Sequence, residues 1–134
     1  LQEKKGGVRM PMAPHARLGC RGEQLTVRFL RRKGYKIITV NFATSAGETD
    51  IVARAKDGTL CFVEVKTRAE GGMFPPAEAV DAEKQKRLIS NAYRFLSAMH
   101  EDADSVKRRF DIAEVTARII FDAEINYIKD AFTE

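Results

Sequence analysis

The sequence predicts a single α/β or α+β domain in which helices cover a β-sheet. Three observations support this prediction. The chain has 134 residues, which is enough for one modest hydrophobic core but not for two. Its composition, 44% hydrophobic and 31% charged, is ordinary for a globular domain, and no stretch is long and apolar enough to cross a membrane. Its hydrophobic spacing alternates between helical and strand-like periods in the order helix, three strands, helix, two strands.

The chain is expected to begin with a tail and a helix. Residues 1–15 contain two adjacent glycines, two prolines and little apolar content, so they are predicted to form a flexible tail before one domain spanning 16–134. Apolar residues at helical spacing predict a helix over 16–33, with Gly34 as its C-cap. A strand over 35–43 is expected to follow.

The remaining elements are predicted from alternation, turn residues and a second apolar stripe. Pro76 is expected at the N-terminus of a helix that runs to about His100, because the first helical position needs no N–H. The other expected elements are two strands that flank Asp57-Gly58 within 47–68, a loop at 69–75, a polar connection at 101–109, and strands at 110–117 and 124–129.

Two registers are open for the central hairpin. A two-residue loop, Asp57-Gly58, would place Asp50 opposite Val65 and on the wrong face for a shared site. A three-residue loop that adds Lys56, with Gly58 left-handed, places Asp50 opposite Glu64. The second register also gathers the apolar residues of both strands on one face, so it is the predicted one. A bulge near Thr49 would have the same effect.

The polar face of this hairpin suggests a catalytic centre. Opposed Asp50 and Glu64 would have Cβ atoms about 4.5–5.5 Å apart, and carboxylates that close need a shared proton, a cation or a divalent metal. Mg²⁺ suits such a pair together with water and a substrate phosphate, and Lys66 on the same face could aid the attacking water. Glu23 could join if the first helix packs beside the strand ends. The alternative is a surface network of ion pairs across the strands.

Charge and cysteine content suggest the partner and the compartment. Residues 1–36 carry ten Lys or Arg against two Glu, a charge of +8, and the remainder carries thirteen against seventeen, a charge of −4. A basic segment beside an acidic pocket suggests a polyanion and a metal, although a solvated basic helix is the simpler explanation. Cys20 and Cys61 lack metal-site spacing and are expected to be buried thiols in a reducing cytoplasm.

The order of motifs resembles that of the YraN-like family of uncharacterised bacterial proteins. The resemblance covers about residues 17–132. The matching stretches are Gly22-Glu23, Gly34-Tyr35, Asn41-Phe42, Gly47 to Ala53, Phe62 to Arg68, Ala79-Val80 with Lys84 and Arg87, Arg109-Phe110-Asp111 and Ala131-Phe132.

That family is similar to the restriction-endonuclease-like PD-(D/E)XK superfamily and to archaeal Holliday-junction resolvases. The resemblance implies an α/β fold with a central mixed five-stranded sheet flanked by helices, in the order α-β-β-β-α-β-β. It implies that Asp50, Glu64 and the Val65 carbonyl bind Mg²⁺ or Mn²⁺, that Lys66 is the catalytic lysine, and that Glu23 completes the catalytic set.

The resemblance also implies a nucleic-acid partner, with DNA expected. Lys84 and Arg87 match a basic helix start, and Arg68, Arg31 and Arg32 are the other expected contacts. The resulting hypothesis is a Mg²⁺-dependent nuclease that cuts branched or flap DNA in repair or recombination. Two copies would suit a symmetric branched substrate. The alternative is a non-catalytic nucleic-acid-binding module of the same fold.

Overall fold

The computed structural model describes residues 14–72, 80–117 and 123–134. Within these ranges the elements follow one another as α1 (Pro14–Arg32), β1 (Lys36–Thr44), β2 (Gly47–Arg54), β3 (Leu60–Ala69), α2 (Ala82–Ala98), β4 (Arg108–Ala117) and β5 (Ala123–Phe132).

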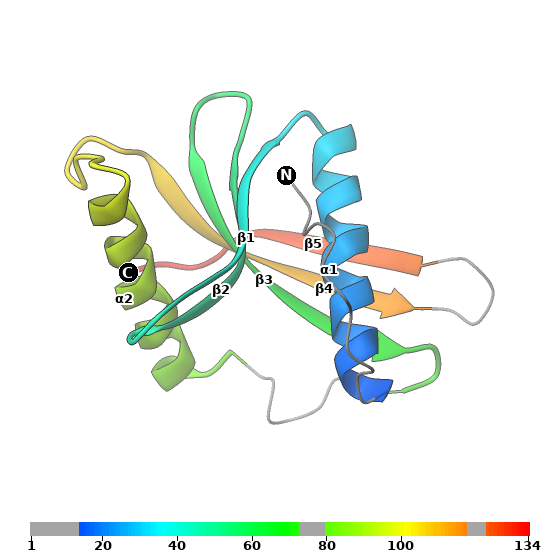
Figure 1. Cartoon of the computed structure of the whole chain (residues 1–134). Helices are drawn as coiled ribbons and strands as arrows, with labels where there is room; N and C mark the ends of the chain where they lie inside the picture. The colour runs from blue at the N-terminus through cyan, green and yellow to red at the C-terminus, as the bar shows by residue number, and fades with distance from the viewer. Residues whose placement is uncertain (1–13, 73–79, 118–122) are drawn as a thin grey trace, which may run out of the picture.

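The strands form one five-stranded sheet in chain order. β3 and β4 are parallel, and the other neighbouring strands are antiparallel. Parallel strands need a crossover connection, which α2 supplies. Figure 1 shows α1 and α2 on opposite sides of this twisted sheet. The predicted α/β class, the mixed sheet and the order of elements are confirmed.

The predicted register of the central hairpin is confirmed between Arg54 and Ile51, but the predicted pair of Asp50 with Glu64 lies beyond the last ladder pair and does not form. The Ala55 N–H donates to the Thr59 carbonyl at 2.9 Å, so the loop has three residues. Gly58 within it is left-handed, with φ of 93°. The pairs continue in this register as far as Ile51 opposite Val63.

The two faces of the sheet carry separate hydrophobic cores, because successive residues of a strand point to opposite faces. The α1 face buries Ile51, Ala53, Cys61 and Val63 of the hairpin against Val27 and Leu30. Cys61 is fully buried, as predicted, and burial raises the pKa of its thiol to about 12. The side chain of Cys20, also predicted to be buried, lies outside the described part of the chain.

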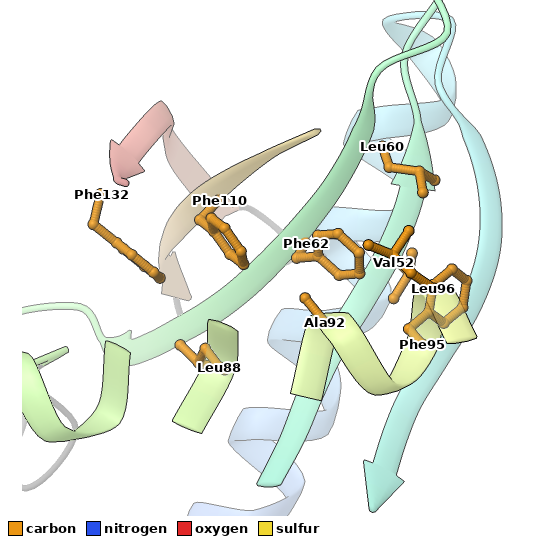
Figure 2. Packing of buried hydrophobic residues seen from close by; sticks show 9 residues of the cluster. All are labelled: Val52, Leu60, Phe62, Leu88, Ala92, Phe95, Leu96, Phe110 and Phe132. Carbon is orange, nitrogen blue, oxygen red and sulfur yellow. The ribbon is translucent and has the colours of Figure 1, made fainter. Parts of the chain in front are cut away.

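The α2 face is built around Phe62, which lies between aromatic neighbours in Figure 2. Its ring stacks on Phe110 at 5.6 Å between centroids and meets Phe95 edge-on at 5.7 Å. Phe110 in turn stacks on Phe132 at 5.1 Å. This row joins α2 to β3, β4 and β5.

A buried carboxylate on β4 forms hydrogen bonds that connect β4 with β5. Asp111 has no exposed surface and accepts hydrogen bonds from Arg109 Nε at 3.0 Å, the Tyr127 hydroxyl at 2.6 Å and the Asp130 N–H at 2.8 Å. Arg109 also donates to the Tyr35 hydroxyl. The Arg109-Phe110-Asp111 stretch that marked the family therefore links the residue before β1 to β4 and β5.

Several predicted boundaries are wrong. The second helix begins at Ala82 rather than Pro76, because the Asp81 side chain caps it by accepting from the Lys84 N–H. Pro76 itself and most of the expected tail lie outside the described residues, while α1 begins two residues before the predicted helix.

The last two strands are longer than predicted. β4 begins at Arg108, and β5 continues to Phe132, which pairs with Phe110 beyond a register shift. Asp130, left-handed at φ 54°, interrupts the period-two pattern there. In the part of the chain that the structure describes, none of the helices is both long and apolar enough to span a bilayer.

Candidate functional site

The candidate site lies where β2 and β3 separate. The ladder of backbone hydrogen bonds between them ends at Ile51 and Val63. Beyond it, the Val65 N–H donates to a side chain, Asp50 Oδ2, at 2.8 Å. In Figure 1 the β1–β2 hairpin then runs toward α2, while the end of β3 runs toward the first half of α1. Asp50 is therefore fixed at a fork in the sheet.

A pocket of about 210 Å³ occupies this fork on the α2 side. Asp50 and Glu64 both line it, so the two carboxyl groups that the register was expected to bring together do share one site. The described residues around it are Gly47, Glu48, Asp50, Glu64, Lys84, Arg87 and Leu88.

The acids of the pocket perturb one another. Burial, and then the neighbouring charge of Glu64, raise the pKa of the Asp50 carboxyl to about 9, although the hydrogen bond from Val65 opposes the shift. Glu23 and Glu48 raise it further. The raised pKa favours the protonated form of Asp50, and a divalent ion bound in the pocket would lower that pKa.

Glu23 reaches this cluster from α1. Burial and then the charge of Glu48 raise the pKa of Glu23, while hydrogen bonds to the side chains of Asp50 and Asn41 oppose that shift. The helical acid that the sequence singled out is therefore in contact with the strand acid. Asn41 is left-handed, with φ of 52°, and its contact with Glu23 was not predicted.

Gly22 explains how α1 comes so close to the sheet. A Cβ atom at this position would lie 2.1 Å from Thr67 Oγ1 and 3.2 Å from Thr67 Cβ. Only glycine allows the helix to pack against β3 at this distance, which places the next residue, Glu23, beside Asp50. The signal in the sequence was a glycine inside a helical pattern, which usually has a packing reason.

Glu64 forms an ion pair with Lys84, a residue that was expected to bind phosphate. Lys84 Nζ lies 2.6 Å from Glu64 Oε2, and the Glu64 side chain is only 9% exposed. Arg87, one turn along α2, lines the same pocket and is exposed. The basic start of α2 is therefore at the acidic site, as predicted, but one of its two cations already neutralises an acid.

Three other predicted residues are not brought into the pocket. Lys66 is 7% exposed and is not among the described residues that line it. Arg68 donates to Thr116 Oγ1 at 3.1 Å and to the Gly72 carbonyl at 2.6 Å. Val65 contributes its N–H to Asp50.

Arg31 and Arg32 are also distant from the pocket. They lie in the last turn of α1. Eight and nine residues separate them from Glu23, which is about 12 Å or more along the helix axis. Both side chains are exposed, so they belong to another part of the surface.

Asn91 is a supporting residue that sequence reasoning missed. It is fully buried on α2, and its amide donates to the Phe42 carbonyl and to Thr49 Oγ1, each at 3.0 Å. Its own oxygen accepts from Thr44 Oγ1. These bonds clamp the β1–β2 hairpin to α2 next to Asp50. An asparagine in an apolar helical stripe was the available signal.

The donor set can be compared with the needs of a divalent ion. Among the described residues, no three His, Cys, Asp or Glu side chains are grouped so as to hold a metal by themselves. Mg²⁺ does not require such a cage, since one or two carboxylates plus water and substrate phosphate suffice. Asp50 and Glu64 in one pocket fit this kind of site.

Fold and site together define an α/β domain with a carboxylate pocket at the fork of its central hairpin. The chain belongs to the uncharacterised protein family UPF0102, whose family model matches residues 22–115. This confirms the family recognised from the sequence motifs.

Relatives in this family align over nearly their whole length. A UPF0102 protein of Alkaliphilus oremlandii is 40% identical over 116 residues, 87% of this chain and 97% of the relative. One from Chlorobium phaeobacteroides is 40% identical over 126 residues, 93% and 96% of the two chains. One from Chlorobaculum tepidum is 41% identical over 121 residues, 86% and 91%.

A solved structure described as an EndoMS–dsDNA2 complex also matches. The TM-score is 0.35 and the identity 13%, over 81% of this chain and 38% of that chain. A TM-score of this size does not establish a common fold or a common activity.

Proposed function

We propose that this protein is a Mg²⁺- or Mn²⁺-dependent nuclease that cleaves phosphodiester bonds of DNA, with branched or flap DNA as its substrate in repair or recombination. The observation that carries the proposal is the shared pocket of Asp50 and Glu64, with Lys84 and Arg87 at its edge. Acids that hold a divalent ion beside cations that bind phosphate are what phosphodiester hydrolysis needs.

The residues divide the work as follows. Asp50 and Glu64, with the Val65 carbonyl, would hold the ion, and Glu23 would orient Asp50 through their direct contact. A bound divalent ion supplies charge stabilisation for the phosphate under attack. Arg87 and Lys84 would bind phosphate oxygens. Lys66 does not line the pocket, but it lies two residues beyond Glu64 on the same side of β3, and it is the proposed catalytic lysine.

Cleavage of a panel of substrates tests the proposal. Duplex, flap, four-way junction and single-stranded DNA would be incubated with Mg²⁺ or Mn²⁺ and with the wild type, Asp50→Asn or Glu64→Gln. Loss of cleavage in both variants is expected. The matched control is Asp104→Asn, which removes an exposed acid outside the pocket. Cleavage that survives Asp50→Asn would assign the activity to a contaminant.

Ion binding can be measured without any substrate. Millimolar Mg²⁺ or Mn²⁺ is expected to raise the melting temperature of the wild type and of Asp104→Asn, because a ligand that binds only the folded state stabilises it. The increase should be absent in Asp50→Asn. Equal increases in all three proteins would place the ion elsewhere.

A second candidate function is a non-catalytic nucleic-acid-binding module. The observation that favours it is the 2.6 Å ion pair between Lys84 and Glu64, which neutralises one pocket acid without a metal. Duplex binding with no cleavage of any substrate, and no thermal response to divalent ions, would select this alternative.

Compartment and assembly complete the proposal. A cytoplasmic location suits the free buried thiol of Cys61. A homodimer would suit a symmetric branched substrate, and light scattering with and without junction DNA tests this.

A further inference from the structure

The outer face of α1 carries an arginine stripe, made of Arg21, Arg28, Arg31 and Arg32. At 3.6 residues per turn these positions fall within about 100° of arc. Val27 and Leu30 lie in the core beneath the helix, so the stripe faces away from the sheet. Gln24 lies on the same arc, and the one acid of the described helix, Glu23, lies off it and contacts Asp50.

Among the described residues, none pairs its negative charge with the stripe. Arg28, Arg31 and Arg32 are exposed and Arg21 is half-buried. None of the four makes an ion pair or a side-chain hydrogen bond with another described residue. Arginines of the sheet differ: Arg54, Arg108 and Arg109 each pair with an acid.

Helix stability does not explain the stripe. Arg31 and Arg32 lie in the last turn, where cations favour the helix dipole, but that effect fades within one turn and does not reach Arg21. Arg28 and Arg32 are four residues apart, a spacing at which like charges repel and destabilise a helix. The positive charge on this face therefore destabilises α1 slightly and needs an explanation other than helix stability.

We propose that the arginine stripe binds the phosphate backbone of a nucleic-acid duplex at a surface separate from the pocket. The proposal rests on the proposed function for the identity of the polyanion. From Arg21 to Arg32 the helix rises by eleven steps, about 16 Å, and a duplex of that length carries about ten phosphate charges. One guanidinium group can donate two parallel hydrogen bonds to two oxygens of a phosphate, and a lysine ammonium group cannot form this bidentate contact.

The position of the stripe adds a specific role. The pocket is lined by residues of β2, β3 and α2, and α2 covers the face of the sheet opposite to α1. A duplex held along the stripe therefore lies outside the pocket, while another segment of the same molecule reaches Asp50. This arrangement fits DNA with two arms better than a straight duplex.

The experiment measures how duplex binding depends on salt, in EDTA, so that no cleavage occurs. The test variant replaces Arg28, Arg31 and Arg32 by Gln. The matched control replaces Lys36, Lys107 and Lys129 by Gln, which removes three exposed cations elsewhere and leaves the same net charge. The probe is a 20-base-pair duplex of arbitrary sequence.

The arginine variant is expected to lower the slope of log affinity against log salt by about 2 to 3, since each lost phosphate contact contributes about 0.9. The lysine control should keep the wild-type slope, and the melting temperature of the arginine variant should not fall. Equal slopes for the two triple variants, or a wild-type slope for the arginine variant, would overturn the proposal. Arginine-dependent adsorption to phosphatidylglycerol vesicles without DNA binding would also overturn it and would identify a membrane surface.

This test is independent of the nuclease proposal. Asp50→Asn leaves the stripe intact and is expected to bind duplex with the wild-type slope. If no substrate of the panel is cleaved but the salt slopes are as expected, the arginine stripe binds duplex and the nuclease proposal is wrong. If cleavage occurs and the arginine variant keeps the wild-type slope, the opposite holds.

Discussion

The Oδ2 atom of the Asp50 carboxyl group accepts a hydrogen bond from the backbone N–H of Val65 at 2.8 Å, just beyond Ile51 and Val63, the last ladder pair of β2 and β3. A side chain here replaces the strand partner that Val65 has lost. The acid at the centre of the pocket is thus also a part of the sheet, and its protonation state affects the stability of the fold.

Asp50→Asn is expected to flatten the dependence of stability on pH. The pKa of Asp50 is raised from its ordinary value of 3.8 to about 9, chiefly by burial. The folded state then holds a proton that the unfolded state releases above pH 4, so this contribution to stability is complete below about pH 4 and is lost as pH rises toward 9. Urea unfolding at pH 5, 7 and 9 in EDTA measures it. Asp104→Asn should keep the wild-type dependence, and parallel curves for the wild type and Asp50→Asn would refute the argument.

Lys84→Met is expected to destabilise the protein by about 1–3 kcal/mol, because it leaves the buried Glu64 carboxylate without its partner. Removing the acid as well, in Lys84→Met with Glu64→Gln, should restore most of the loss. Urea unfolding of the two single variants and the double variant gives the coupling energy. Additive losses would mean that the 2.6 Å contact contributes nothing.

Gly22→Ala should cost about 1–3 kcal/mol, although alanine is the better helix former, because the new methyl group overlaps Thr67 Oγ1. Thr67→Ala in the same chain should recover part of this, since it removes the atom 2.1 Å from the new Cβ. Gln24 lies two residues further along α1 and is exposed, so Gln24→Ala is the matched control and should change stability very little. A Gly22→Ala protein as stable as the wild type would show that α1 can move away from β3 at no cost.

Asn91→Ala is expected to lower stability by about 2–4 kcal/mol, because it removes three hydrogen bonds and leaves Thr49, which is 1% exposed, without its donor. Hydrogen exchange of the amides of β2 should accelerate more than that of β4, since the clamp holds the β1–β2 hairpin. Ser90→Ala, its exposed neighbour on α2, should change stability by less than about 0.5 kcal/mol. Uniform acceleration across the sheet would indicate global destabilisation without a local clamp.

The hairpin and its register could be predicted because local rules act there. Alternating polarity fixes which residues share a face, and the left-handed Gly58 fixes the loop, so the placement of Asp50 near Glu64 followed from residues within fifteen positions of each other. The start of α2 differs from the prediction because proline and aspartate are both typical of helix N-termini, and the side chain that caps this helix is that of Asp81.

The contacts that complete the site could not be predicted from local patterns. Lys84 lies in the first turn of α2 and Glu64 lies on β3, so their ion pair depends on how α2 packs on the sheet. The burial of Lys66 away from the pocket lining depends on the same packing. The role of Gly22 depends on its contact with Thr67, 45 positions later, so local patterns cannot reveal it.

The buried Asp111 has a consequence for experiments on this chain, which contains three tyrosines and no tryptophan. The Tyr127 hydroxyl is bound to the Asp111 carboxylate, the Tyr93 hydroxyl to Glu134, and the Tyr35 hydroxyl to Arg109. Two of the three phenol groups are held by carboxylates, a contact that quenches tyrosine emission, so we expect the fluorescence of the protein to rise on unfolding. The fold thus carries an intrinsic optical signal, and a single tryptophan introduced beside the pocket could be read without interference from any other indole.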